Sequence, residues 1–284
     1  MDDWTSADSG VRYMLRNVRY EVIPTATIED KILGSVPKDV VVTVTASPTK
    51  GLDATVELAE RLATHGYKVV PHISARLVAD QQHLKDLVDR LRGTGIQDVF
   101  VPAGDADPPA GKYDAALPLL ADLAVIGKPF ADIGITGYPE SHPSIEDDIT
   151  VQSMWDKRLH ATYIVSNLCF DSKVLAGWVN RVRRRKVMLP IRLGLAGPID
   201  RTKLLSMASK IGVGESTKFL TKHASWFARL AAPGGYSPER LLRRTVERLD
   251  PSTSAVAGLH LFTFNQVAET ETWRQQLLGH VVAH

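Results

Sequence analysis

The sequence predicts a single-domain α/β protein, a (β/α)8 barrel of the TIM type with extra helices between strands 7 and 8. Eight short apolar runs alternate with longer helical patterns along the 284 residues, and this alternation is typical of βαβ units in a parallel sheet. Eight units of about 35 residues account for the whole chain as one barrel. Polar residues follow seven of the eight runs, at the strand ends where such barrels hold their active sites.

The expected strands are nearly continuous apolar runs, as is usual for parallel strands that are covered on both faces. They lie at 19–23, 40–45, 68–73, 98–101, 132–136, 163–167, 188–193 and 258–262. The expected helices gather apolar residues on one face, as Leu84, Leu87 and Leu91 do in the second of them. They lie at 53–65, 80–92, 114–125, 146–160, 172–184, 201–211, 216–230, 238–249 and 267–278. Three of these fall between the last two strands, which we interpret as an insertion on the barrel.

The main rival is a doubly wound sheet, which usually carries a glycine-rich turn after its first strand. Here residues 21–25 read Glu-Val-Ile-Pro-Thr, which disfavours the rival without excluding it. The length alone would suit about two domains. We expect an N-terminal extension over 1–17, a catalytic barrel over 18–279 and a short tail over 280–284.

The amino-acid composition argues against several kinds of partner and site. The 34 Lys and Arg against 32 Asp and Glu give a net charge of +2, with 44% hydrophobic residues, so we expect neither a nucleic-acid nor a membrane partner. The single cysteine excludes an internal disulfide. The N-terminal stretch has no apolar signal core, so we expect a cytoplasmic protein. Neither His-x-x-x-His nor Cys-x-x-Cys occurs, which argues against a zinc site.

Three other motifs have ordinary structural interpretations. The glycine-rich stretch 212–217 could bind phosphate, but it is more typical of one helix ending and the next being capped. The glycines at 194–197 follow strand 7, where barrels often hold phosphate. The basic run 181–186 lies at a helix C-terminus, where cations are favoured. Cys169 is expected to be a small buried apolar residue.

The residues at the strand ends also have structural alternatives when each is taken alone. Glu21 lies within an apolar strand, where a carboxylate costs free energy unless it is paired or functional. Asp105 could cap a turn, His72 could be a loop histidine, and Asn167 could cap the next segment. Their common position at one rim favours a shared site.

Seven short motifs follow one another in a fixed order. They are RYEVIP at 19–24, VT at 44–45, PHIS at 71–74, GD at 104–105 with PP at 108–109, YPESHP at 138–143, NLCFD at 167–171 and HLFTFN at 260–265. This series resembles the motifs of the methylenetetrahydrofolate reductase family, whose members are (β/α)8 barrels. YPESHP is the most specific of them, and the ordered series is stronger than any one member.

The resemblance implies reduction of 5,10-methylenetetrahydrofolate to 5-methyltetrahydrofolate. Glu21 matches the family's general acid, which protonates the leaving nitrogen as the substrate ring opens to an iminium. Asp105 matches the aspartate that stabilises the iminium charge. Asn167 replaces the glutamine that contacts the pterin and is one methylene shorter. Phe264 and Gln266 are expected to bind substrate as well.

The resemblance also concerns the hydride source. Most family members relay hydride from NADH or NADPH through FAD. Thr45, His72, Tyr138 and His142 match the family's flavin-contacting positions, and together with Gly104 they are the expected cofactor-binding residues.

Other positions depart from the flavin-binding pattern. The arginine before Gly-Asp is Ala103, and in the helix over 151–158 only Lys157 and Arg158 could serve the flavin diphosphate, while Met154 and Trp155 could fill its space. We therefore expect direct reduction by NADH (or NADPH), with the FAD relay as the alternative. A non-catalytic folate-binding or methyl-transfer partner barrel is the second alternative.

Overall fold

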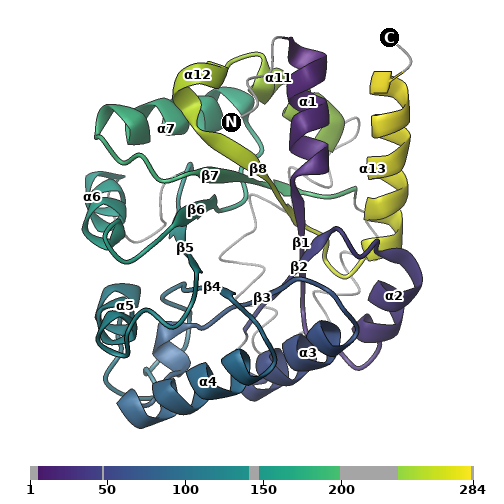
Figure 1. Cartoon of the computed structure of the whole chain (residues 1–284). Coiled ribbons are helices and arrows are strands. Elements are labelled where there is room, and N and C mark those ends of the chain that lie inside the picture. The colour runs from purple at the N-terminus through teal and green to yellow at the C-terminus, as the bar shows by residue number, and fades with distance from the viewer. Residues whose placement is uncertain (1–5, 47, 141–146, 199–235, 283–284) are drawn as a thin grey trace.

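The computed structural model describes residues 6–46, 48–140, 147–198 and 236–282. Its eight strands form one parallel sheet in the order β3-β2-β1-β8-β7-β6-β5-β4. An isolated bridge between His72 and Phe100 joins the two edge strands, so the sheet nearly closes on itself (Figure 1). The strands are β1 Val18–Val22, β2 Val41–Val44, β3 Val69–Pro71, β4 Asp98–Phe100, β5 Asp132–Gly137, β6 Tyr163–Ser166, β7 Ile191–Ala196 and β8 Val256–Phe262.

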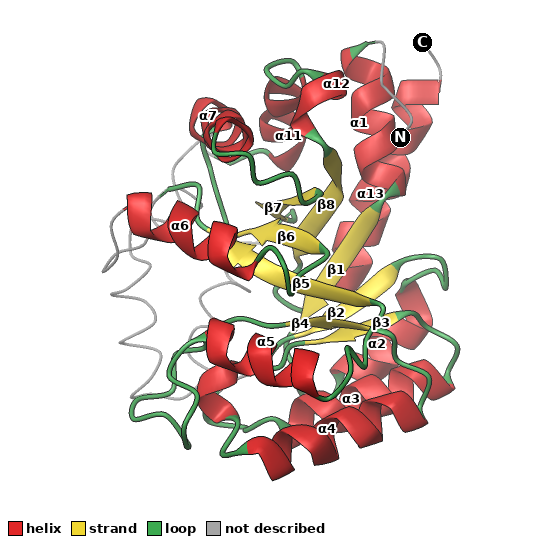
Figure 2. Ribbon diagram, turned by 60° about the vertical axis from the view of Figure 1, so that its left-hand side comes forward, coloured by secondary structure: helices red, strands yellow, loops and turns green. Residues whose placement is uncertain are grey.

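Helices surround the sheet, as Figures 1 and 2 show from two directions. They are α1 Ala7–Arg16, α2 Ile28–Ser35, α3 Asp53–Thr64, the 3-10 helix η1 Ala75–Leu77, α4 Gln81–Gly93, α5 Ala116–Val125, α6 Asp147–Lys157, α7 Ser172–Arg184, α11 Pro238–Val246, α12 Pro251–Ser254 and α13 Val267–Val282. The (β/α)8 barrel predicted from the sequence is confirmed. The expected helices at 201–211 and 216–230 lie outside the described residues. None of the helices that the structure describes is long and apolar enough to cross a membrane.

The stretch expected as an extension contains a helix that the sequence analysis did not predict. Ser6 and Ser9 form a capping box at the start of α1, which satisfies two backbone donors of the first turn. Val11, Met14 and Leu15 are buried, and the helix packs against α11, α13 and β8. The buried apolar side chains of α1 span only Val11 to Leu15, so the helical pattern in the sequence is short.

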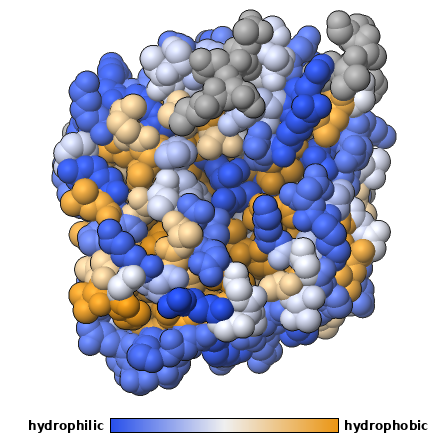
Figure 3. Space-filling view, viewed as in Figure 1, coloured by the Kyte–Doolittle hydropathy of each residue, from blue (hydrophilic) through white to orange (hydrophobic). Residues whose placement is uncertain are grey.

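The seventh strand begins and ends three residues later than the expected range of 188–193. Met188 is 61% exposed, and Lys186 takes a left-handed φ of 62° where the chain leaves α7. Apolar Met188 and Leu189 resemble the start of a strand, but they belong to the loop. Exposed hydrophobic residues of this kind are interspersed with hydrophilic ones on the surface (Figure 3), as on most folded proteins.

Alternation along β1 sends its residues to opposite sides of the sheet. Tyr20 faces outward and donates a 2.7 Å hydrogen bond to Oε2 of Glu271 on α13. Arg19 faces the barrel interior, where it forms a 2.8 Å ion pair with Asp98 and a 2.8 Å hydrogen bond with the hydroxyl of Tyr163. That hydroxyl is also 2.8 Å from Oδ1 of Asp98. The same alternation turns Glu21 inward, one layer above Arg19.

Candidate active site

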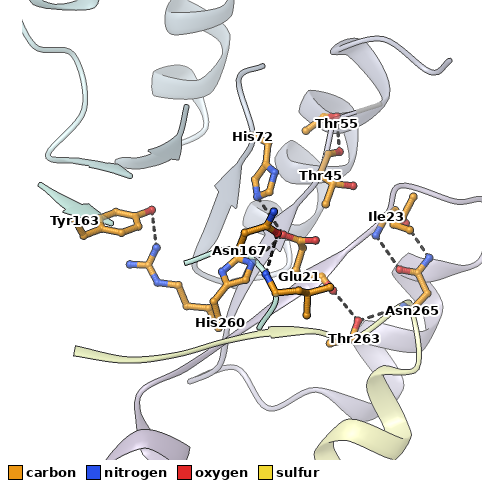
Figure 4. Close-up of polar contacts among 12 residues, drawn as sticks. Glu21, Ile23, Thr45, Thr55, His72, Tyr163, Asn167, His260, Thr263 and Asn265 are labelled. Carbon is orange, nitrogen blue, oxygen red and sulfur yellow. Dashed lines mark hydrogen bonds and ion pairs between the residues drawn. The ribbon is translucent and has the colours of Figure 1, made fainter. Parts of the chain in front are cut away.

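A carboxylate and two imidazoles meet at the inner face of β1, β3 and β8. Oε2 of Glu21 lies 2.8 Å from Nε2 of His260 and 3.8 Å from Nε2 of His72. The three side chains are largely buried, with Glu21 15% exposed, His72 8% and His260 2%. Figure 4 shows both rings directed toward the same end of the Glu21 carboxylate. Glu21 and His72 lie at this rim as their sequence positions predict, whereas no role is predicted for His260 from the sequence.

The surroundings of His72 keep its imidazole uncharged. Burial lowers the pKa of His72 to about 4, since the nearby charge of Glu21 offsets this only in part and His260 adds to it. The His72 ring also packs against Phe100, with 4.7 Å between the ring centroids. Near neutral pH, Glu21 therefore has a neutral imidazole on this side and not a counter-ion.

The segment after β8 fixes the backbone on both sides of Glu21. The hydroxyl of Thr263 donates a 2.6 Å hydrogen bond to the carbonyl of Glu21. The side chain of Asn265 accepts from the amide of Ile23 at 2.8 Å and donates to its carbonyl at 2.9 Å. Phe264 and Asn265 both have positive φ, 49° and 59°, a conformation that is uncommon outside glycine and in which asparagine is enriched. The carboxylate therefore stands on a rigid strand end.

Two predicted rim residues lie on the loops after β4 and β5. Gly104 has a φ of +88°, and a Cβ there would lie 2.9 Å from that of Ser74, so only glycine fits without strain. Arg76 holds the same loop through a 2.6 Å hydrogen bond from its Nε to a loop carbonyl. Asp105 is exposed. Burial raises the pKa of Tyr138, and the charge of Asp105 raises it further, so the structure brings these two loops together.

Thr45 and Asn167 directly follow β2 and β6, at the strand ends where they were expected. The amide of Thr45 donates to the carbonyl of Val22 at 2.9 Å, and its carbonyl accepts the hydroxyl of Thr55 at 2.8 Å. Oδ1 of Asn167 accepts the amide of Leu168 at 2.8 Å. Figure 4 draws Asn167 and Thr45 in the same region as Glu21.

An apolar and aromatic cluster lies where β6, β7 and β8 end. Its members are Leu168, Phe170, Ala196, Tyr236, Phe262 and Phe264. Phe170 and Tyr236 meet edge to face with centroids 5.3 Å apart, and the hydroxyl of Tyr236 donates to the carbonyl of Ala196. Flat aromatic walls of this kind suit a planar ring system. Phe264 was expected here, whereas Tyr236 was missed because it follows the long insertion and no motif marks it.

The remaining predicted site residues are less informative. Gln266 is buried, and its carbonyl accepts the hydroxyl of Thr270 at 2.8 Å in the first turn of α13. His142 lies outside the described residues. Cys169 is buried as expected, and burial raises the pKa of its thiol to about 12, so it is not activated as a nucleophile.

Helix α6 offers an apolar side to the barrel. Val151 is 6% exposed and Met154 1%, and both belong to the main hydrophobic core. Trp155 packs against that core and lies under the guanidinium of Arg158, which is 3.5 Å from the ring centroid. On α6, Val151, Met154 and Trp155 therefore serve packing, and Lys157 with the adjoining Arg158 are the residues here whose chemistry suits a diphosphate. Within the described ranges no cluster of His, Cys, Asp and Glu could hold a metal ion.

Comparison with known proteins identifies the family. The family model for methylenetetrahydrofolate reductase matches residues 27–276, a range that begins after Glu21. Among solved structures, a candidate lyase/mutase from Burkholderia cenocepacia J2315 is 11% identical with a TM-score of 0.49, over 98% of this chain and 86% of that one. An oxaloacetate acetylhydrolase is 13% identical with a TM-score of 0.46, over 84% of this chain and 94% of that one. Because the family match spans most of the sequence, the chain belongs to the methylenetetrahydrofolate reductase family, which implies an oxidoreductase that acts on methylenetetrahydrofolate.

Proposed function

We propose that this protein reduces 5,10-methylenetetrahydrofolate to 5-methyltetrahydrofolate by direct hydride transfer from NADH (or NADPH) to the ring-opened iminium. The family supports the substrate. A nicotinamide is a sufficient hydride donor for an iminium carbon, so the chemistry does not require a relay. The reaction also consumes one proton, which must reach the nitrogen that leaves the ring.

Glu21 is the proposed source of that proton. A general acid must be held within reach of the leaving nitrogen and must keep its proton near neutral pH. The observation that carries the proposal is the position of this carboxyl: it faces inward at the end of β1, is 15% exposed, and lies 2.8 Å from His260. Such an acid would be of no use in a barrel that only binds folate, so this geometry disfavours the non-catalytic alternative.

The other predicted residues have proposed roles around this acid. Asp105 would stabilise the cationic iminium, because a carboxylate close to developing positive charge lowers the barrier. The proposed contacts with the folate come from Asn167, Phe264 and Gln266. The proposed contacts with the dinucleotide come from Thr45, His72, Gly104, Tyr138 and His142.

The proposal of direct transfer is supported by α6. In the stretch 151–158, where family members carry residues for the flavin diphosphate, Val151 and Met154 instead pack into the hydrophobic core, and the arginine that precedes Gly-Asp in the family is Ala103 here. We also propose a cytoplasmic location, because the single cysteine has no partner in the sequence and the substrates are those of one-carbon metabolism.

The test is NADH oxidation that depends on methylenetetrahydrofolate, together with the visible spectrum of the purified protein. We expect activity, no flavin absorbance, and no gain from added FAD. Yellow protein that releases flavin on denaturation would instead establish the FAD relay. Folate binding without NADH or NADPH oxidation would favour the non-catalytic barrel.

Replacing Asp105 gives a separate test of the charge-stabilising role. We expect Asp105→Ala to lower kcat by about 10- to 100-fold, since one electrostatic contact to a transition state is worth up to a few kcal/mol. The circular dichroism spectrum should not change, because the residue is exposed. Unchanged turnover would remove Asp105 from the mechanism.

A further inference from the structure

The two imidazoles beside Glu21 are arranged unequally around one oxygen. Both of their Nε2 atoms face Oε2, at 2.8 Å from His260 and at 3.8 Å from His72. Only the first distance allows a hydrogen bond. The other carboxyl oxygen, Oε1, takes part in neither contact. The carboxyl group is therefore held at one oxygen and leaves the other for a ligand.

This arrangement specifies where the acidic proton can reside. When His260 carries its proton on Nε2, it donates to Oε2, and a proton on Glu21 must then lie on Oε1. Nδ1 of His260 is buried and has no hydrogen-bond partner among the described residues. Nδ1 is unpaired in either tautomer, whereas a proton on Nε2 gives the carboxylate oxygen a hydrogen-bond donor at 2.8 Å. The Nε2–H tautomer is thus the favoured one.

We propose that His260 is a positioning residue that directs the proton of Glu21 to the substrate from Oε1 and stabilises the carboxylate left behind. This inference rests on the proposed function. In the step, the O–H bond of Glu21 breaks, an N–H bond forms on the leaving nitrogen, and the C–N bond of the substrate ring opens to the iminium. The hydrogen bond from His260 persists and becomes charge-assisted, which makes it stronger in the product state of the transfer.

The other groups around Glu21 do not replace His260 as the hydrogen-bond donor to its carboxylate. Nε2 of His72 is too distant to donate, and burial keeps that ring neutral by lowering the pKa of His72 to about 4. Phe262 packs against the His260 ring with 5.0 Å between the centroids. The charged and titratable groups in the layer below are Arg19, Asp98, Tyr163 and Arg192, of which Arg19 and Asp98 are paired with each other.

The test compares variants that keep or remove the donor. In His260→Gln the amide nitrogen can take the place of Nε2, so we expect kcat within about threefold of the wild type. In His260→Leu the donor is lost, and we expect kcat to fall by about 10- to 100-fold, part of the range for general acid catalysis. The alkaline limb of the pH–rate profile should also move to higher pH in His260→Leu, because the carboxylate is no longer stabilised. If this variant does not fold, His260→Asn replaces it, since its amide is too short to reach Oε2.

The outcomes separate this inference from the proposed function. No reductase activity in the wild type would overturn the proposed function itself. Suppose that the wild type is active and Glu21→Gln is inactive. If kcat and the alkaline limb are then unchanged in His260→Leu (or His260→Asn), the positioning role alone is overturned. Equal loss in the Gln and Leu variants without a shift of the limb would also overturn it. Tyr67→Phe is the matched control, because it removes buried hydrogen bonds to the carbonyls of Ile32 and Val36 and should lower the melting temperature without moving the profile.

Discussion

Strand β1 contributes one side chain to each of two layers of the barrel interior, and the two side chains have different surroundings. In the lower layer, Arg19 is paired with Asp98 and hydrogen-bonded to Tyr163. In the upper layer, two residues further along β1, the ionisable side chains that contact Glu21 among the described residues are His72 and His260. A buried charge with a close counter-ion keeps its protonation state, whereas a carboxyl that has no permanent cation beside it can gain and lose a proton. The difference indicates that the lower layer serves the fold and the upper layer the chemistry.

Removing the acidic proton of Glu21 in the upper layer should have the largest effect on turnover. In Glu21→Gln the amide keeps the shape but cannot act as an acid, so we expect kcat to fall by about 100- to 10,000-fold. Urea unfolding should change little, because Gln can still accept the hydrogen bond from His260. The measurement is steady-state NADH oxidation with methylenetetrahydrofolate. Near-normal turnover in a folded variant would mean that the two layers do not differ in the proposed way.

Breaking the lower layer should affect stability first. Arg19→Met leaves the Asp98 side chain, which is 18% exposed, without its paired cation, and we expect a loss of unfolding free energy at or below the lower end of the ~3–5 kcal/mol that is typical of a fully buried pair. Equilibrium urea unfolding would measure this cost. In Arg19→Met/Asp98→Asn the uncompensated charge is gone, so part of the loss should return. A single variant as stable as the wild type would show that the ion pair is not what holds this layer.

Converting the upper layer into a copy of the lower one would sharpen the comparison. His72→Lys would place a cation close to Oε2 of Glu21, which lies 3.8 Å from Nε2 of His72 in the wild type, and an opposite charge at that distance favours the carboxylate. We expect at least about a tenfold loss of kcat/KM at neutral pH, with activity recovering toward lower pH where Glu21 is protonated again.

His72→Gln is the neutral control for this experiment. It should retain an alkaline limb close to that of the wild type, because no charge is added beside Glu21. A His72→Lys enzyme with the wild-type pH profile would contradict the view that neutrality beside Glu21 matters.

The strands and Glu21 could be predicted from the sequence, whereas the contacts around Glu21 could not. The eight strands are runs of apolar residues, and Glu21 was recognisable because it interrupts such a run. The partnership of Glu21 with His260 spans 239 positions of the chain, and only closure of the barrel brings them together. The strand 7 boundary was wrong because Met188 and Leu189 are apolar loop residues. The hydrogen bonds that join Thr263 and Asn265 to the backbone of Glu21 and Ile23 depend on left-handed backbone angles at 264 and 265. No local sequence pattern predicts these angles.

The outward face of β1 provides a third environment for a carboxylate, that of Glu271. Substitution there should have the smallest effect of those considered. Glu271 accepts hydrogen bonds from Tyr20 at 2.7 Å, from Arg274 at 2.8 and 2.9 Å and from Gln275 at 2.7 Å. Burial alone would raise the pKa of Glu271, but these donors lower it below the usual 4.5. The resulting stability is therefore present above about pH 4.5 and is lost as the pH falls through the lowered value.

We expect Glu271→Gln to lower the unfolding free energy by about 1–3 kcal/mol at neutral pH, as for hydrogen bonds to a charged group. The deficit should shrink as the pH falls below about 4.5, because the wild-type carboxylate is then protonated as well. Urea unfolding between about pH 7 and pH 3.5 measures both quantities. Glu60→Gln, which removes a more exposed pair with Arg90, is the control and should cost no more than about 1 kcal/mol. A deficit that is constant over this pH range would show that Glu271 acts through shape and not through its charge, and that β1 is fastened to α13 by packing.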